Sequence, residues 1–260
     1  MNTRRPSPFW VGLAVIAGAY LLFILAMLAA TASYSTPDHL LKSLTSREIR
    51  FSIGLSIVTC TVTALLSLLL AVPVGYLLAR GRFPGKTVVE ALLDIPIVLP
   101  PMVMGLCLLI LFQTGFGKFV EQAIPFTYTV YGVILAQFVI GAAFAVRTMR
   151  GTFDHLSSRP EDVAMTLGCS RAKAVWLVTL PAARRGMFAS ASVAWARSLG
   201  EFGPILVFAG ATRMKTEVLP TTVWLELSVG NLEAAVAVSL LMVVFATCVL
   251  VAVRMMGEKV

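Results

Sequence analysis

The fold class is decided by a stretch of 29 residues without a charged side chain, Phe51–Ala79, which reads FSIGLSIVTCTVTALLSLLLAVPVGYLLA. A helix needs about 20 predominantly apolar residues to cross a bilayer, so this stretch is long enough to span one. Similar runs recur along the chain, and one of them is interrupted only by Arg197 and Glu201. The sequence therefore predicts an all-α integral membrane protein with six transmembrane helices, at Phe9–Leu41 (polar after Ala30), Phe51–Ala79, Ile95–Gly117, Gln122–Val146, Gly186–Thr212 and Ala234–Val253.

The composition supports this class and excludes others. Of 260 residues, 58% are hydrophobic and 13% are charged, about half the charged share of a soluble domain. We expect one transmembrane domain over residues 1–260, and a retained first helix, because Phe9–Ala30 is too long for a signal-peptide core. The four cysteines form no CxxC pair, and His39 and His155 are isolated. No metal, cofactor or catalytic group is predicted, which argues against a membrane-embedded enzyme.

The positive charges indicate the orientation. With the N-terminus inside, fourteen Lys and Arg residues flank the spans on one side and six on the other. Because cytoplasmic loops are enriched in basic residues, this bias predicts a multi-pass protein of the cell membrane with both termini in the cytoplasm. The net charge of +8 follows this topology and forms no basic stripe with interleaved aromatics, so no nucleic-acid partner is expected. The stretch Gly81–Thr87 (GRFPGKT) has three residues between its glycines instead of the four of a nucleotide-binding loop, and is predicted to be a basic turn.

Prolines interrupt the third predicted span. Pro96, Pro100 and Pro101 lack backbone donors and disfavour helix at the preceding residues. We therefore expect Asp94–Met104 to be kinked or irregular. Irregular backbone at membrane depth is tolerated where it is buried in protein or lines a cavity, so this segment is either a packing kink or part of a pathway.

The long polar stretch between Arg147 and Gly186 predicts a helical pair on the cytoplasmic side. Ser157 or Ser158 can cap a first helix, and Gly168 offers a left-handed stop. Ser170 can cap a second helix, Arg171–Thr179, which we expect to end near Leu180-Pro181. Apolar residues, namely Val163, Leu167, Val175, Trp176 and Val178, make this pair a candidate partner surface.

The spacing in this loop resembles the signature of ATP-binding-cassette (ABC) importer permeases. Asp162-Val163-Ala164, three residues, Gly168, nine residues and Val178-Thr179-Leu180-Pro181 match the family pattern Glu-Ala-Ala, three residues, Gly, nine residues, Ile, any residue, Leu-Pro. Asp162, Val163 and Val178 are mild departures. The resemblance implies a type I importer-like fold. In that fold, a loop at about residues 151–182 couples the permease to a separate ATPase subunit. It assigns that coupling to Glu161, Asp162, Ala164 and Gly168, with Leu180 and Pro181 as terminator.

Two further segments narrow the resemblance. Asp94–Pro101 (DIPIVLPP), continuing to Gly105, is similar to the third-helix segment of molybdate and tungstate permeases. Ala196–Gly203 (ARSLGEFG) resembles a fifth-helix motif that these share with sulfate permeases. Molybdate or tungstate ranks above sulfate or thiosulfate because the double proline matches better.

The charged pair in the fifth predicted span must avoid lipid. One charge at a helix centre costs about 2.5–3.5 kcal/mol on insertion scales, so Arg197 and Glu201 should face the helix bundle or a wet cavity. They are either an internal pair that fixes packing or a gate in a translocation pathway, together with Pro100 and Pro101. The small residues between Ala189 and Ser198 favour close helix contact or a dimer interface.

The resemblance implies a permease subunit without an ATPase site of its own. Its expected partners are two copies of an ABC ATP-binding subunit, a second copy of this chain, an extracytoplasmic solute-binding protein and membrane lipid. A secondary transporter is the alternative class, but it would need acidic or His relays across several spans, and the sequence offers one central pair.

Overall fold

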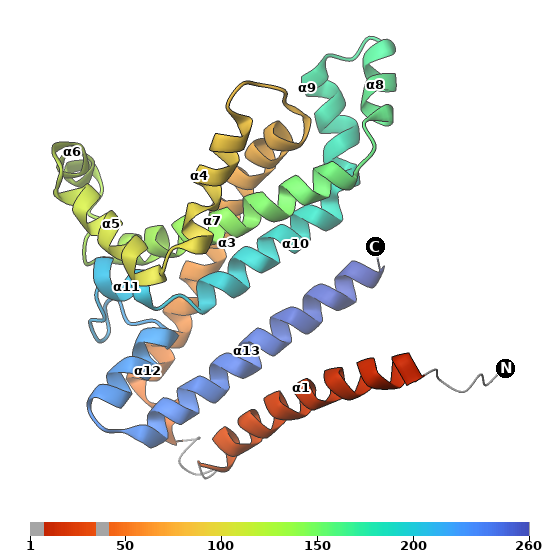
Figure 1. Cartoon of the computed structure of the whole chain (residues 1–260). Coiled ribbons are helices and arrows are strands. Elements are labelled where there is room, and N and C mark those ends of the chain that lie inside the picture. Colours follow the sequence, from red (N-terminus) through yellow and green to blue (C-terminus); the bar gives the residue numbers. More distant parts are fainter. Residues whose placement is uncertain (1–7, 35–41, 260) are drawn as a thin grey trace.

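The computed structural model of the chain describes residues 8–34 and 42–259, and these form helices joined by loops, without a β-strand among them (Figure 1). Within these residues, four helices are long and apolar enough to cross a membrane. They are α1 (Pro8–Ser33), α3 (Arg47–Arg80), α7 (Val130–His155) and α13 (Leu232–Lys259, apolar over Leu232–Val251). The all-α membrane class is confirmed; the predicted end of the first span, residues 35–41, lies outside the described residues.

The third predicted span, Ile95–Gly117, is not one straight helix. Helix α4 (Lys86–Val98) and helix α5 (Pro101–Gln113) are bent by 110° at Leu99-Pro100. Leu99 and Pro100 are extended, as expected for residues that precede a proline. The irregularity expected within Asp94–Met104 is confirmed, and α4–α5 counts as a fifth span only if the bent pair is taken as one.

Two other predicted boundaries are wrong. The fourth span begins at Val130 and not at Gln122, because α6 (Gly115–Ala123) ends in a turn and Thr129 caps α7 by accepting a hydrogen bond from Gly132 N–H. Gly186–Thr212 is also no single helix: α10 (Leu180–Leu199) stops at Gly200, and α11 (Gly203–Phe208) and α12 (Leu219–Ser228) follow. Helix α10 carries three arginines, so its composition alone does not mark it as a span.

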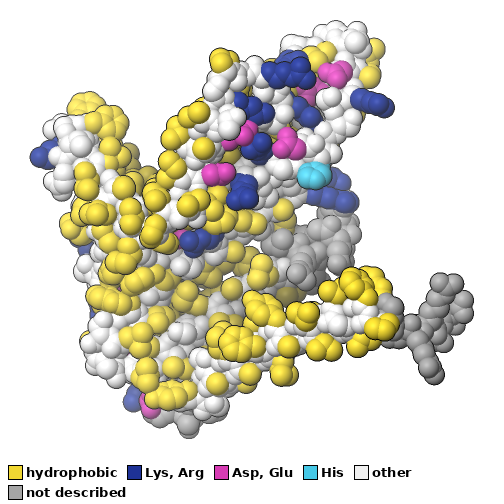
Figure 2. Space-filling view, viewed as in Figure 1, with side chains coloured by type: hydrophobic (Ala, Val, Ile, Leu, Met, Phe, Trp, Pro, Cys, Tyr) yellow, Lys and Arg dark blue, Asp and Glu magenta, His cyan; other side chains and the backbone are white. Residues whose placement is uncertain are grey.

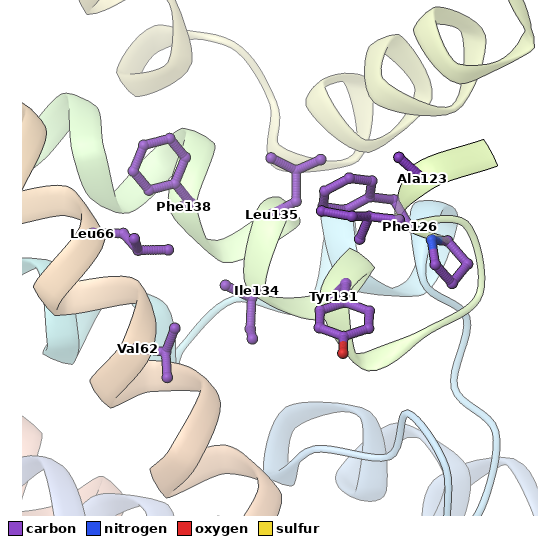
Figure 3. Close-up of a pocket in the computed structure, with 10 residues that line it drawn as sticks. Val62, Leu66, Ala123, Phe126, Tyr131, Ile134, Leu135 and Phe138 are labelled. Atoms are coloured by element: carbon purple, nitrogen blue, oxygen red, sulfur yellow. The ribbon is translucent and has the colours of Figure 1, made fainter. Parts of the chain in front are cut away.

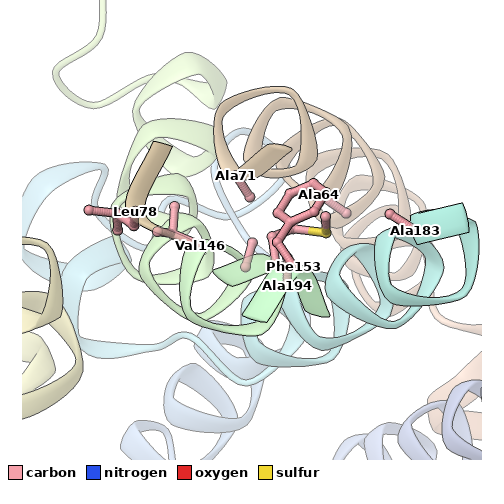
Figure 4. Packing of buried hydrophobic residues seen from close by; sticks show 9 residues of the cluster. Ala64, Ala71, Leu78, Val146, Phe153, Ala183 and Ala194 are labelled. Carbon is pink, nitrogen blue, oxygen red and sulfur yellow. The ribbon is translucent and has the colours of Figure 1, made fainter. Parts of the chain in front are cut away.

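The best-packed part of the chain is the contact of α3, α7 and α10 (Figure 4). Its buried side chains are mostly small, so the helices lie close together. A Cβ on Gly75 of α3 would come within 2.8 Å of Met149 Cβ on α7. Helix α1 contributes no buried residue and lies beside α13 (Figure 1), so its apolar surface remains open to lipid or to another chain.

The cytoplasmic loop predicted from the sequence is a projecting helical pair at one end of the molecule (Figure 1). It consists of α8 (Arg159–Thr166) and α9 (Arg171–Ala174), followed by a π-helical turn, η1 (Val175–Thr179), that leads into α10. The predicted turn is confirmed: Gly168 has a φ of 93°, and Ser170 Oγ accepts a hydrogen bond from Lys173 N–H at 3.4 Å.

Candidate functional site

The second helix of the loop does not end at Leu180-Pro181, contrary to the prediction. Helix α9, η1 and α10 form one continuous helical path from Arg171 to Leu199. The π turn accommodates the proline, because Leu180 N–H bonds to the Val175 carbonyl five residues back and Pro181 falls in the first turn of α10. Leu180 and Pro181 are therefore a junction between the projecting loop and α10, and not a terminator.

Glu161 faces the interior of the described chain. It is 6% exposed, and each carboxylate oxygen accepts a hydrogen bond: Oε1 from the Tyr76 hydroxyl at 2.5 Å and Oε2 from the Thr179 hydroxyl at 2.9 Å. These bonds connect α8 to α3 and to η1. Glu161 thus positions α8, and its assignment to coupling stays a prediction.

The outer side of the loop is free and apolar. Four large side chains that the fold leaves without cover, Val163, Leu167, Trp176 and Leu177, are 56%, 80%, 72% and 63% exposed. Asp162 and Gly168 are exposed beside them, and Ala164 is half-buried. An apolar patch on a small polar projection is typical of a protein-binding surface. Of the four residues assigned to coupling, Glu161 is an internal anchor, and the other three lie at or near this exposed face.

Arg197 and Glu201 form the expected ion pair, but at the end of a helix and not in its middle. Arg197 lies in the last turn of α10, and Glu201 follows the cap residue Gly200. Arg197 Nη1 is 2.6 Å from Glu201 Oε1, and the guanidinium lies 5.6 Å from the Phe144 ring centroid. Glu201 Oε1 accepts no well-aligned hydrogen bond within the described chain. Its contact with Arg197 is therefore an ion pair defined by the short distance between the two charged groups.

The exposure of this pair is strongly unequal. The Glu201 side chain is 1% exposed, whereas that of Arg197 is 31% exposed and lines a hollow of about 350 Å³ between α7, α10 and α13. A buried carboxylate with a single cation beside it depends on that cation for its charge. The arrangement therefore fixes the break after α10 and leaves part of the guanidinium accessible.

The broken helix α4–α5 and the break after α10 meet each other. Helix α5 packs on α11 through two close backbone approaches. A Cβ on Gly203 would lie 2.9 Å from Met102 N, and one on Gly105 would lie 2.8 Å from Pro204 Cα. Pro100 and Pro101, which begin α5, thus lie in the same junction as the segment after Glu201, although about a hundred residues separate them in the sequence.

A buried polar network supports this junction and was not predicted. Gln137 of α7 donates from Nε2 to the Ser198 carbonyl at 3.2 Å, and Thr63 of α3 donates to Gln137 Oε1 at 3.2 Å. Ser56 Oγ accepts from Leu219 N–H at 2.8 Å, which holds the start of α12. The sequence did contain a signal for this network, namely the Gln137 amide within an apolar run. Such a group is buried only where it has hydrogen-bond partners.

A second charged cluster lies in the segment after α11. Arg213 donates to Glu226 Oε1 at 2.8 Å and lies 3.5 Å from Glu217 Oε1. Glu217 is fully buried, and burial raises its pKa, opposed by a hydrogen bond from Met214 N–H and by the Arg213 charge. Asn231 also donates to Glu226 Oε2 at 2.8 Å. The cluster holds the α11–α12 loop and the α12–α13 turn together.

Another hollow of the described chain has an apolar wall. About 580 Å³ lies between α3, the α6–α7 turn and α7 (Figure 3), and its wall is built from side chains such as Val62, Phe126 and Phe138. An apolar wall cannot replace the hydration of a dianion, so this hollow suits an acyl chain or an apolar side chain. No cluster of three metal-binding side chains occurs among the described side chains, those of residues 8–34 and 42–251.

Comparisons with known proteins agree with one another. Residues 71–260 match the family model described as "Binding-protein-dependent transport system inner membrane component". A probable molybdenum ABC transporter permease protein of Haloferax volcanii is 34% identical over 259 residues, 99% of this chain and 94% of that protein.

Two further permeases match part of the chain, and one solved structure has a similar fold. A molybdate/tungstate transport system permease protein of Pyrococcus abyssi is 40% identical over 59% of this chain and 58% of its own length. A sulfate transport system permease protein of Salmonella typhimurium is 36% identical over 64% of this chain and 61% of its own length. A chain of a bacterial alginate ABC transporter has the same fold, with a TM-score of 0.73 at 15% identity, covering 96% of this chain and 94% of that one.

Proposed function

We propose a role in oxyanion import for this chain, which belongs to the family of binding-protein-dependent transport system inner membrane components. It acts as the membrane-spanning permease subunit of an ATP-driven importer, and it moves a tetrahedral oxyanion, molybdate or tungstate, into the cell. The relatives that bear those names support this substrate. Sulfate is the second candidate, because a sulfate permease also matches.

The observation that carries the proposal is the projecting loop. Helix α8 is anchored inside by Glu161 and exposes Val163 and Leu167 outside, so the loop presents an apolar surface on a rigid base. A separate ATP-binding subunit would grip this surface, and Asp162, Ala164 and Gly168 would lie in or beside the contact. The chain itself would hydrolyse no ATP.

We expect the chain to work within a larger assembly, as its resemblance to ABC importer permeases implies. A second copy of the chain would complete the pathway, each copy would hold one ATP-binding subunit, and a solute-binding protein would deliver the ion outside. The open apolar faces of α1 and α5 are suited to lipid and to the second copy. With α8 in the cytoplasm, both termini are cytoplasmic, as the distribution of basic residues also favours.

Arg197, Glu201, Pro100 and Pro101 would form part of the translocation pathway. Two broken helices meet there, and an accessible guanidinium offers positive potential to a dianion. Irregular backbone at membrane depth is expected where it lines a cavity.

The test combines purification with uptake. The tagged chain should copurify with a cytosolic cassette ATPase, and cells that express the complete system should accumulate molybdate in an ATP-dependent manner. Competition with tungstate but not with sulfate would separate the two substrate candidates. Uptake by the chain alone, driven by a proton gradient, would refute the proposal in favour of a secondary transporter.

A further inference from the structure

A polar pocket of about 420 Å³ lies beside the projecting loop, and the proposed function gives no role to its basic side chains. It is formed by the end of α3, the Gly81–Gly85 turn, the start of α4 and α8. Its charged lining consists of Arg80, Arg82, Lys86, Glu161, Asp162 and Arg171. Figure 2 shows basic side chains gathered at this end of the molecule, with fewer acidic ones among them.

The charges of the pocket do not cancel. Four basic groups face two carboxylates, and Glu161 already uses both oxygens on the hydroxyls of Tyr76 and Thr179. Asp162 is exposed to solvent, where its field is screened. The remaining potential at the pocket is therefore positive.

Several donors of the pocket have spare capacity. Arg80 donates from Nη2 to the Leu156 carbonyl at 2.6 Å, but its buried Nε has no acceptor within the described part of the chain. Lys86 Nζ has only long contacts, 3.5 Å to the Gly81 carbonyl and 3.9 Å to Glu90 Oε1. A bound anion would supply Lys86 Nζ with a closer acceptor.

The backbone adds to this positive potential. Lys86 is the first residue of α4, a helix of 13 residues, and the cap residue Gly85 has a φ of 77° and no side chain to satisfy the first N–H groups. The first turn of α4 carries no acidic residue. The positive end of the helix therefore lies beside the pocket, and the nearest acidic residue of α4, Glu90, pairs more closely with Arg150, at 3.1 Å.

We propose that this pocket binds a phosphate-type oxyanion, either free or as the headgroup of an anionic lipid. The bound anion bridges the Gly81–Gly85 turn and Arg171, and so connects α4 to α9. The pocket is adjacent to Glu161, so an anion there would restrain α8 relative to the transmembrane helices. The cytoplasmic location of the pocket rests on the proposed function; the binding itself does not.

Equilibrium binding of radiolabelled inorganic phosphate tests the site. The full-length chain is placed in nanodiscs of phosphatidylcholine, without an ATPase that has phosphate sites of its own. The variant Arg82→Gln/Arg171→Gln removes two exposed charges of the pocket. Arg184→Gln/Arg185→Gln removes two exposed charges of α10 that do not line it. We expect at least tenfold weaker phosphate binding for the pocket variant and unchanged binding for the control.

A second arm identifies the source of the anion. If the headgroup is the ligand, nanodiscs that contain phosphatidylglycerol will abolish phosphate binding. Native mass spectrometry will then show retained phosphatidylglycerol in the wild type and the control variant but not in the pocket variant.

Three results would overturn the proposed site. The first is an equal loss of phosphate binding in both variants, and the second is no effect of either variant on phosphate binding or lipid retention. The third is a pocket variant that alters only copurification of the ATPase, which would assign the charges to a protein contact. Uptake and copurification by the wild type test the proposed function separately.

Discussion

Replacing Glu161 by alanine tests whether α8 is held by an internal carboxylate. The variant removes two hydrogen bonds, from the Tyr76 hydroxyl at 2.5 Å and the Thr179 hydroxyl at 2.9 Å. Each bond to a charged group contributes about 1.5–3 kcal/mol, and relief of the buried charge offsets part of their sum. A net loss of roughly 2–3 kcal/mol in holding α8 corresponds to a factor of about 30–150 in the population of the docked geometry.

The assay is the ratio of ATP hydrolysed to molybdate imported, measured with the complete transporter in proteoliposomes. We expect Glu161→Ala to raise this ratio severalfold, because the ATPase would move a loop that no longer moves α3 and α10 with it. Asp154→Ala is the control: Asp154 is an exposed carboxylate whose contact with Arg150 is 3.6 Å long, worth at most about 0.5 kcal/mol.

A double-mutant cycle gives the decisive comparison. Tyr76→Phe removes the other partner of one bond, so the effects of Tyr76→Phe and Glu161→Ala on thermal unfolding should not add, with an interaction of about 1–2 kcal/mol. Additive effects, or a Glu161→Ala transporter as tightly coupled as Asp154→Ala, would refute the anchoring role.

Three further predictions concern the turn and the junction. Gly168→Val, at a φ of 93°, should destabilise the loop by about 1–2 kcal/mol and uncouple ATP turnover from uptake; unchanged uptake would count against the coupling role. Gly203→Ala places a Cβ against α5 backbone and should reduce the yield of folded protein on size exclusion, whereas Gly54→Ala, in open space, should not. Arg197→Ala should destabilise the protein by about 3–5 kcal/mol through the unpaired Glu201; if Arg197→Met/Glu201→Gln restores stability but not uptake, the pair serves transport.

The features of the fold that depend on a residue and its immediate neighbours could be predicted from the sequence. Uninterrupted apolar runs identified α3 and α13, and the double proline located the break at Leu99-Pro100. Gly168 and Ser170 were identified correctly because a left-handed φ and an N-cap each depend on one residue and its immediate neighbours.

The remaining features depend on contacts that distant residues supply. Pro181 was expected to end a helix, but the π turn before it absorbs the missing donor, and no local rule distinguishes these outcomes. The internal position of Glu161 could not be predicted, because its partner Tyr76 lies 85 residues away. The break at Gly200 was missed because Arg197 and Glu201 are the only charges in an otherwise uncharged run, and because the close approach of Gly203 to Met102 is a tertiary feature.

The continuity of α9, η1 and α10 gives the loop a mechanical link to the junction. Helix α10 is 20 residues long, about 30 Å at 1.5 Å per residue, and it runs from the base of the loop to Arg197. If the loop couples to an ATPase, a force on α8 would be passed by Glu161 to Thr179, at the start of this helix, and to Tyr76 of α3. Since α10 has no proline after Pro181 and packs on α3 and α7 through small side chains, we expect it to move as a unit. Displacement would then appear at its far end, where the chain is already broken at Gly200 and faces the second broken helix, α4–α5.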